Sequence, residues 1–337
     1  MHPYRDPVDG APLSAEGADL VSPSGRRWRA FGGGWDLRPD RADDNAQQQA
    51  GIYDEKLGEL TDFDHPHNLT LVHQRGLLSA LELHPDDAVL EIGGHRSGVL
   101  PWLERHHRVR GFGLDVSPVW VEAHNRLAAA RGAGTRWVLG TAEALPFRDG
   151  AFAAVVAFDV FEHVSDMGAA LREAARVLRP GGRLVCHLPV RDIAGSFDGY
   201  QRWRDAADFA ARQASVGHFH ERLPTRLQMR TRLEASGFDV LDVQSFNVWL
   251  QPLHDHRLMP ALGRLRHRNA ARDAAGTPTR RGELPRQTAS RFQQVYAAVG
   301  IPVAQALTGL DTLGAHLGLG GSASFVAARS PRPLEPG

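Results

Sequence analysis

The feature that most constrains the fold is a short apolar run followed at once by two glycines. Residues 88–92 have the length of a buried strand, and Gly93 and Gly94 predict a tight turn after it. Ser97 can then begin a helix as its N-terminal capping residue. A strand, a glycine turn and a helix N-terminus in this order let backbone N–H groups and the helix dipole face a bound ligand.

The chain continues as alternating strands and helices, which predicts an α/β fold with a mostly parallel sheet and helices on both faces. The second strand ends in Asp115, about 20 residues beyond the turn, where a carboxylate can accept hydrogen bonds from both hydroxyls of a ribose. The strands of this region are predicted at 88–92, 110–115, 136–139, 152–158 and 182–188, and its helices at 97–107, 117–131 and 166–178.

The turn and three further motifs, taken together, resemble the class I S-adenosylmethionine-dependent methyltransferases, specifically the broad small-molecule group called type 11. The further motifs cover 140–147, 152–164 and 171–185. The resemblance extends over 86–189 and includes a closing strand at 322–329. It implies a Rossmann-like methyltransferase fold with a seven-stranded, mostly parallel sheet, and S-adenosylmethionine as the cofactor.

The same resemblance implies which residues bind the cofactor. The family's first motif has an acidic residue and then three glycines at alternate positions; Glu91 and Gly93 match, whereas His95 and Ser97 stand at the second and third glycine positions. Thr141 stands where the family usually has aspartate. The expected cofactor-binding residues are Tyr53, Glu91, Gly93, Gly94, His95, Asp115, Val116, Thr141, Ala142, Glu143 and Phe158.

The acceptor side is expected after the fourth predicted strand, where Asp159, Glu162 and His163 follow one another. The resemblance makes His163 a catalytic candidate, and an imidazole has a pKa suited to a general base near neutral pH. The alternative is that this segment only packs its loop. His218 is the second catalytic candidate, because it precedes a helix that in similar enzymes follows the acceptor-covering segment.

No metal site is expected. The pairs His65/His67, His218/His220 and His254/His256 could each chelate, but scattered histidines are ordinary in a chain with 17 of them. Residues 1–40 resemble the zinc ribbon that precedes some methyltransferase cores, in a degenerate form without its cysteines. Its ligand positions carry Asp6, Asp9, Ser22 and Gly25, a set poorly suited to structural zinc. The alternative for this segment is an irregular N-terminal arm.

The domain organisation that these patterns predict has five parts. They are a ribbon-like appendage without metal (1–40), a helical lead-in or lid (41–85), a Rossmann-like core (86–250), a helical insertion that covers the acceptor (251–320), and a closing strand with a tail (321–337).

Composition and charge narrow the possible partners. The chain has 39 basic and 39 acidic residues, so nothing indicates a nucleic-acid surface. No apolar run has the length of a membrane span, no signal peptide is evident, and the single cysteine, Cys186, lies in a predicted strand. We therefore expect a cytoplasmic protein whose partner is a small-molecule acceptor; the sequence does not predict its oligomeric state.

The function expected from the resemblance is methyl transfer from S-adenosylmethionine to an oxygen or nitrogen atom of a small molecule, such as a sugar or specialised metabolite. The altered glycine motif favours one alternative, a methyltransferase fold reused as a non-methylating enzyme or as a binding subunit in a biosynthetic pathway. A weaker alternative is an enzyme that binds a dinucleotide or a nucleotide sugar.

Overall fold

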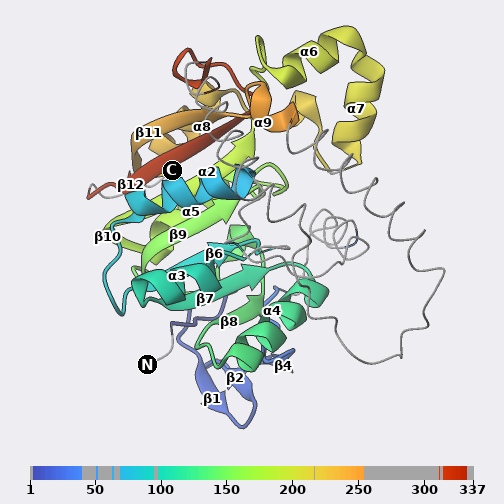
Figure 1. Cartoon of the computed structure of the whole chain (residues 1–337). Helices are drawn as coiled ribbons and strands as arrows, with labels where there is room; N and C mark the ends of the chain where they lie inside the picture. The colour runs from blue at the N-terminus through green and yellow to red at the C-terminus, as the bar shows by residue number, and fades with distance from the viewer. Residues whose placement is uncertain are drawn as a thin grey trace, which may run out of the picture.

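The structure is a computed structural model that describes residues 3–39, 51, 63, 69–94, 98–215, 217–253, 311 and 314–331 (Figure 1). Its centre is a seven-stranded sheet with the strand order β11-β12-β10-β9-β6-β7-β8. The strands are β6 (Ala88–Ile92), β7 (Arg110–Asp115), β8 (Arg136–Leu139), β9 (Phe152–Phe158), β10 (Leu178–Pro189), β11 (Phe238–Phe246) and β12 (Ser322–Arg329).

The sheet is parallel except at β12. Strands β10, β9, β6, β7 and β8 pair in parallel, and β12 inserts antiparallel between β10 and β11. Every residue of β6 is buried, as expected for a central parallel strand that is covered on both faces. This is the Rossmann-like methyltransferase fold, so the predicted fold class and the closing antiparallel strand are confirmed.

The helices lie between the strands as the alternation predicts. A Ser117 cap, whose hydroxyl accepts from the N–H of Trp120, begins α4, and Gly132 ends it in the left-handed conformation. The helices are α2 (Leu69–Leu78), α3 (Leu100–His107), α4 (Pro118–Arg131), α5 (Met167–Val177), α6 (Phe197–Arg204), α7 (Ala206–Ala214), α8 (Arg226–Ala235) and α9 (Leu250–Leu253), with short 3₁₀ turns η1 (Ser79–Leu81), η3 (Ala142–Ala144) and η4 (His220–Arg222).

One predicted helix boundary is wrong. The helix expected from residue 97 begins at Leu100, and no side chain at its own N-terminus caps it. The reason is that a carboxylate from the preceding strand takes the exposed N–H groups instead, as described below. Most of the expected lead-in (41–85) and of the expected insertion (251–320) lies outside the described residues.

The N-terminal segment forms a small antiparallel sheet of β1 (Ser14–Glu16), β2 (Asp19–Val21) and β3 (Arg27–Trp28), followed by a hairpin of β4 (Ala30–Phe31) and β5 (Gly34–Trp35). In Figure 1 this segment lies beside β8, at the end of the large sheet opposite β11. The N–H of Leu37 donates to the carbonyl of Leu139, and the Tyr4 ring packs edge-on against Trp35 in the main core. The segment therefore covers the edge of the sheet, which would otherwise expose unpaired backbone groups.

Two of the positions at which zinc-ribbon ligands were expected, Asp6 and Ser22, are bonded to neighbouring residues of this segment. Asp6 is fully buried, and its carboxylate accepts from the Arg26 guanidinium at 2.9 and 3.0 Å and from the Trp28 indole at 3.2 Å. The hydroxyls of Ser22 and Ser24 lie 2.7 Å apart. Arg26 thus supplies the positive charge beside Asp6.

Candidate active site

Glu91, at the carboxyl end of β6, fastens the glycine turn to helix α3. Its carboxylate accepts from the N–H of Val99 at 2.8 Å and of Leu100 at 3.1 Å, which caps the helix. Glu91 is 4% exposed, and this burial raises its pKa to about 8, although the two N–H donors act in the opposite direction. Glu91 therefore holds the turn and the start of α3 in place.

The two glycines of the turn are required by close packing. Gly93 has a φ of +74°, and a Cβ there would lie 2.5 Å from a methyl group of Val160. A Cβ on Gly94 would lie 2.0 Å from the ring of Trp137, and one on Gly113 would lie 2.1 Å from the same ring. Trp137 is thus the platform under the turn, a role that the sequence analysis missed because glycines far apart in the chain create its space.

Asp115 ends β7 beside this turn. Its Oδ1 accepts from the N–H of Ser117 at 2.9 Å, which fixes the orientation of a carboxylate that is 8% exposed. Its charge contributes to the raised pKa of Glu91, so the two groups lie within electrostatic reach of each other. The structure therefore brings Glu91, the glycine turn and Asp115 together at the carboxyl edge of the sheet, where open α/β folds bind ligands.

The segment after β8 completes this edge. Thr141 and Ala142 are buried, and η3 begins at Ala142. Glu143 accepts from the N–H of Ser165 at 3.0 Å, so it ties this segment to the loop after β9. Val116 is half-buried after β7.

Phe158 is half-buried at the end of β9 and packs against the apolar cluster on one face of the sheet. Tyr53 and His95, which were also expected at the cofactor, lie outside the described residues.

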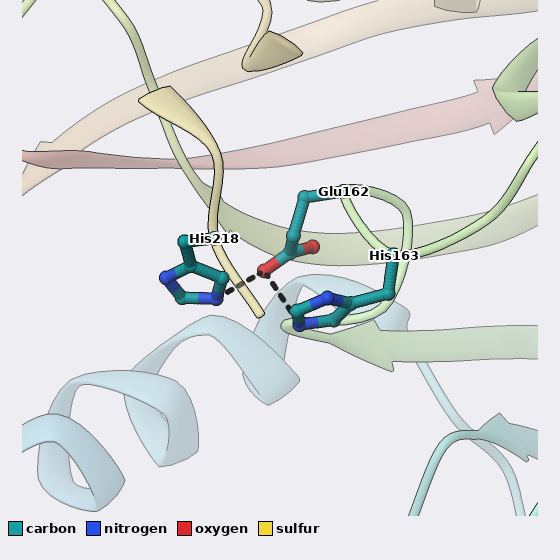
Figure 2. Close-up of side chains that lie close together, drawn as sticks. All are labelled: Glu162, His163 and His218. Carbon is teal, nitrogen blue, oxygen red and sulfur yellow. Dashed lines mark ion pairs between the residues drawn. The ribbon is translucent and has the colours of Figure 1, made fainter. Parts of the chain in front are cut away.

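The acceptor-side candidates come together after β9. Glu162, His163 and His218 point toward one another, the first two from the loop after β9 and the third from the segment between α7 and η4 (Figure 2). Glu162 Oε1 lies 3.5 Å from His218 Nε2 and 3.9 Å from His163 Nε2. The two imidazole rings stack with centroids 5.0 Å apart. The two histidines proposed from sequence are therefore neighbours, and Glu162 lies between them.

The surroundings of Glu162 favour the protonated form of its carboxyl group. Its side chain is 0% exposed, and neither carboxylate oxygen accepts a hydrogen bond from another of the described residues. Burial raises the pKa of Glu162 well above its usual range, and the negative charge of Asp159 raises it further. Two imidazoles and a proton-retaining carboxyl can hold and pass a proton at this position.

Two histidines that the sequence analysis did not single out lie nearby. His187 on β10 is 2% exposed, lies 2.9 Å from the hydroxyl of Ser324, and has its pKa lowered to about 4 by burial. His73 on α2 stacks on Phe246 at 3.9 Å, and its pKa is lowered to about 3, mainly by burial. The pairing of the predicted strands 152–158 and 182–188 could have located His187; nothing in the sequence indicates His73.

Comparison with known proteins agrees with the fold and with the motifs. Residues 90–186 match the family model described as "Methyltransferase domain". The ubiquinone/menaquinone biosynthesis C-methyltransferase UbiE of Caulobacter vibrioides (strain NA1000 / CB15N) is 35% identical over 131 residues, which cover 35% of this chain and 51% of that protein. The chloroplastic tocopherol O-methyltransferase of Arabidopsis thaliana is 31% identical over 121 residues, 34% of each chain. The chain thus spans about half or less of the length of these relatives.

A solved structure supports the fold over a longer stretch. Phosphoethanolamine N-methyltransferase 2 of Haemonchus contortus, in complex with S-adenosyl-L-methionine, superposes with a TM-score of 0.55 at 13% identity and covers 95% of this chain and 71% of that one. Residues 90–186 thus match a methyltransferase domain model, and the superposition shows that the fold is shared. Among the described helices none is both long and apolar enough to cross a membrane.

Proposed function

We propose that this chain binds S-adenosylmethionine at the carboxyl ends of β6, β7 and β8, and transfers its methyl group to an oxygen or nitrogen atom of a small molecule such as a sugar or specialised metabolite. The observation that carries the proposal is the arrangement of one sheet edge, on which a rigid glycine turn and Asp115 lie beside a group of two histidines and a buried glutamate. One relative is named as a tocopherol O-methyltransferase, in keeping with an oxygen acceptor, and the UbiE relative is named as a C-methyltransferase.

The residues of the donor side fit the proposed cofactor. Asp115 is held by Ser117 in an orientation from which a carboxylate can accept from ribose hydroxyls. The absence of side chains at Gly93 and Gly94 lets Val160 and Trp137 pack against the turn, which holds its backbone in place beside Asp115. S-adenosylmethionine, when bound, supplies a methyl group on a positively charged sulfur. The chain must then align the acceptor atom with that methyl group.

The group of Glu162, His163 and His218 would take up the proton that the acceptor atom loses. A hydroxyl or amine that accepts a methyl group must lose a proton, and a histidine within hydrogen-bond reach can accept it. His163 and His218 both lie beside Glu162, whose carboxyl group can share that proton. The acceptor keeps the transferred methyl group and the proton passes to the histidine, so the charges balance.

Calorimetric titration of the full chain with S-adenosylmethionine tests the donor site. Asp115→Asn should weaken binding by about 1.5–3 kcal/mol, the range for a hydrogen bond to a charged group, which is a factor of roughly 10 to 150 in Kd. Asp239→Asn is the matched control, because Asp239 is exposed on β11 at the far end of the sheet. Equal affinity of Asp115→Asn and the wild type would refute the assignment of Asp115.

The alternative function is a methyltransferase fold that no longer transfers methyl groups. The replacement of two motif glycines by His95 and Ser97 favours it. The same titration decides between the two, because folded wild type that gives no heat of binding with near-millimolar donor would support the alternative. Detectable binding together with methylation of a small acceptor would exclude it.

A further inference from the structure

We propose that Glu162, His163 and His218 bind a divalent metal ion of the zinc type through one carboxylate oxygen and two imidazole nitrogens. These ligand atoms all lie within 4.8 Å of one another, and they come from two segments separated by α5 through α7 (Figure 2). This is a different set from the histidine pairs at alternate positions, which the sequence analysis considered and set aside.

The distances between the ligand atoms favour an ion over direct hydrogen bonds. Glu162 Oε1 lies 3.5 and 3.9 Å from the two Nε2 atoms, beyond the usual hydrogen-bond range of about 2.7–3.2 Å. Ligands of a tetrahedral ion with bonds of about 2.0–2.1 Å lie roughly 3.3 Å from one another. The Glu162–His218 separation of 3.5 Å exceeds that spacing by about 0.2 Å, and the Glu162–His163 separation of 3.9 Å exceeds it by about 0.6 Å.

His218 is oriented as a metal ligand. Its Nδ1 lies 3.1 Å from the side-chain carbonyl oxygen of Gln213, which can only accept, so Nδ1 carries a proton and donates. In the neutral imidazole Nε2 then presents its lone pair toward Glu162. An outer hydrogen bond of this kind fixes the tautomer and ring direction of metal-binding histidines.

The second, independent observation is the state of Glu162. Its side chain is 0% exposed and neither of its oxygens accepts a hydrogen bond from another of the described residues. A buried carboxylate in this situation requires a cation or a proton. A lone-pair nitrogen of His218 that faces this oxygen would be repelled by it unless a cation or a proton lies between them.

The donor set selects the kind of ion. Two imidazoles and one carboxylate suit zinc, cobalt or iron rather than magnesium or calcium, which prefer oxygen ligands. Three protein ligands leave a fourth position open, as in catalytic zinc sites. The side chains of His163 and His218 are 9% and 17% exposed, so the group can be reached. An acceptor oxygen in the open position would lose its proton more easily, which would replace proton transfer to an imidazole nitrogen that holds the ion; that use rests on the proposed function, whereas ion binding does not.

The test is a titration of the untagged, chelator-dialysed full chain with Co²⁺, followed by the visible absorption of the bound ion. We expect one ion per chain, and at least tenfold weaker binding in His218→Ala and in Glu162→Gln. His220→Ala is the matched control, because the ring of His220 packs against Phe209. Gln213→Leu, which touches no ligand atom directly, should weaken binding by about 10- to 100-fold.

Two outcomes would overturn the proposal. One is a wild type, folded by circular dichroism, that takes up no Co²⁺. The other is uptake that His218→Ala and His220→Ala reduce equally, which would place the ion elsewhere among the histidines. Calorimetry with S-adenosylmethionine in the absence of metal keeps failure of this proposal separate from failure of the proposed methyl transfer.

Discussion

Glu91→Gln is expected to change how the stability of the protein depends on pH. Burial raises the pKa of Glu91 from 4.5 to about 8. The unfolded chain therefore gives up this proton near pH 4.5, whereas the folded chain retains it until about pH 8. Because the folded state binds more protons across this window, the free energy of unfolding falls as the pH rises through it.

The size of the expected change in the free energy of unfolding follows from the difference between the two pKa values of Glu91. The two pKa values differ by about three and a half units, and each unit corresponds to about 1.36 kcal/mol. The Glu91 contribution is therefore fully present below about pH 4.5, and on the order of 5 kcal/mol of it is lost by about pH 8. Glutamine keeps an oxygen that can accept from Val99 and Leu100 but has no proton to lose, so its contribution should not vary with pH.

The assay is urea denaturation of the wild type, Glu91→Gln and Glu122→Gln at several pH values across this window. Glu122 is the control because half of its side chain, 51%, is exposed on α4. We expect the wild type to lose several kcal/mol relative to Glu91→Gln as the pH rises, while Glu122→Gln runs parallel to the wild type. Curves for the wild type and Glu91→Gln that stay parallel would refute the burial argument.

Two further substitutions test packing at the sheet edge by chemical denaturation. Trp137→Ala should cost about 3–5 kcal/mol, because the ring is 1% exposed and supports the glycine turn, whereas Trp203→Ala, at 82% exposed, should cost little. A loss below about 1 kcal/mol for Trp137→Ala would contradict the platform role. Asp6→Asn should cost about 3 kcal/mol, the lower end for breaking a buried ion pair, since its guanidinium partner is 35% exposed. Asp9→Asn, 38% exposed, is its control, and equal costs for both would disprove the special role of Asp6.

The sequence predicted the large sheet well because its strands are bounded locally. The run that became β9 is apolar throughout and that of β6 is apolar except for Glu91. They end at an acidic residue and at a glycine turn, so their positions follow from residues close in the chain. The start of α3 was predicted wrongly because its cap is Glu91, eight residues before Val99 and part of a strand. A capping rule that considers only adjacent residues cannot detect this.

Other parts of the fold were not predicted, because they bury few residues or depend on contacts between distant positions. Helices α6 and α7 are capped by Ser196 and Asp205, but α6 buries only Phe197 and Gln201, and α7 only Phe209. The packing of Tyr4 beside Phe147 joins positions far apart in the chain. Such contacts depend on the assembled sheet.

The candidate site likewise contains residues that could be predicted from the sequence and a contact that could not. Asp115 ends a predicted strand, and Thr141 closely follows another. Their positions at the candidate site could therefore be predicted, because parallel strands bring their carboxyl ends to one edge of the sheet. The contact between Glu162 and His218 could not be predicted, since it depends on the path of the chain through β10, α6 and α7.

The roles of the two buried glutamates at this edge are distinguished by their surroundings. Both lie near strand ends, and burial raises the pKa of each. Glu91 receives two backbone N–H groups, so the fold itself uses its oxygens. Glu162 receives none from any other described residue and faces two imidazole nitrogens instead. If position 162 contributed only packing, an apolar side chain there would make the fold more stable, because a buried carboxyl without donors costs free energy. Glu162 is therefore the residue of this edge whose presence is best explained by a bound cation or a transferred proton.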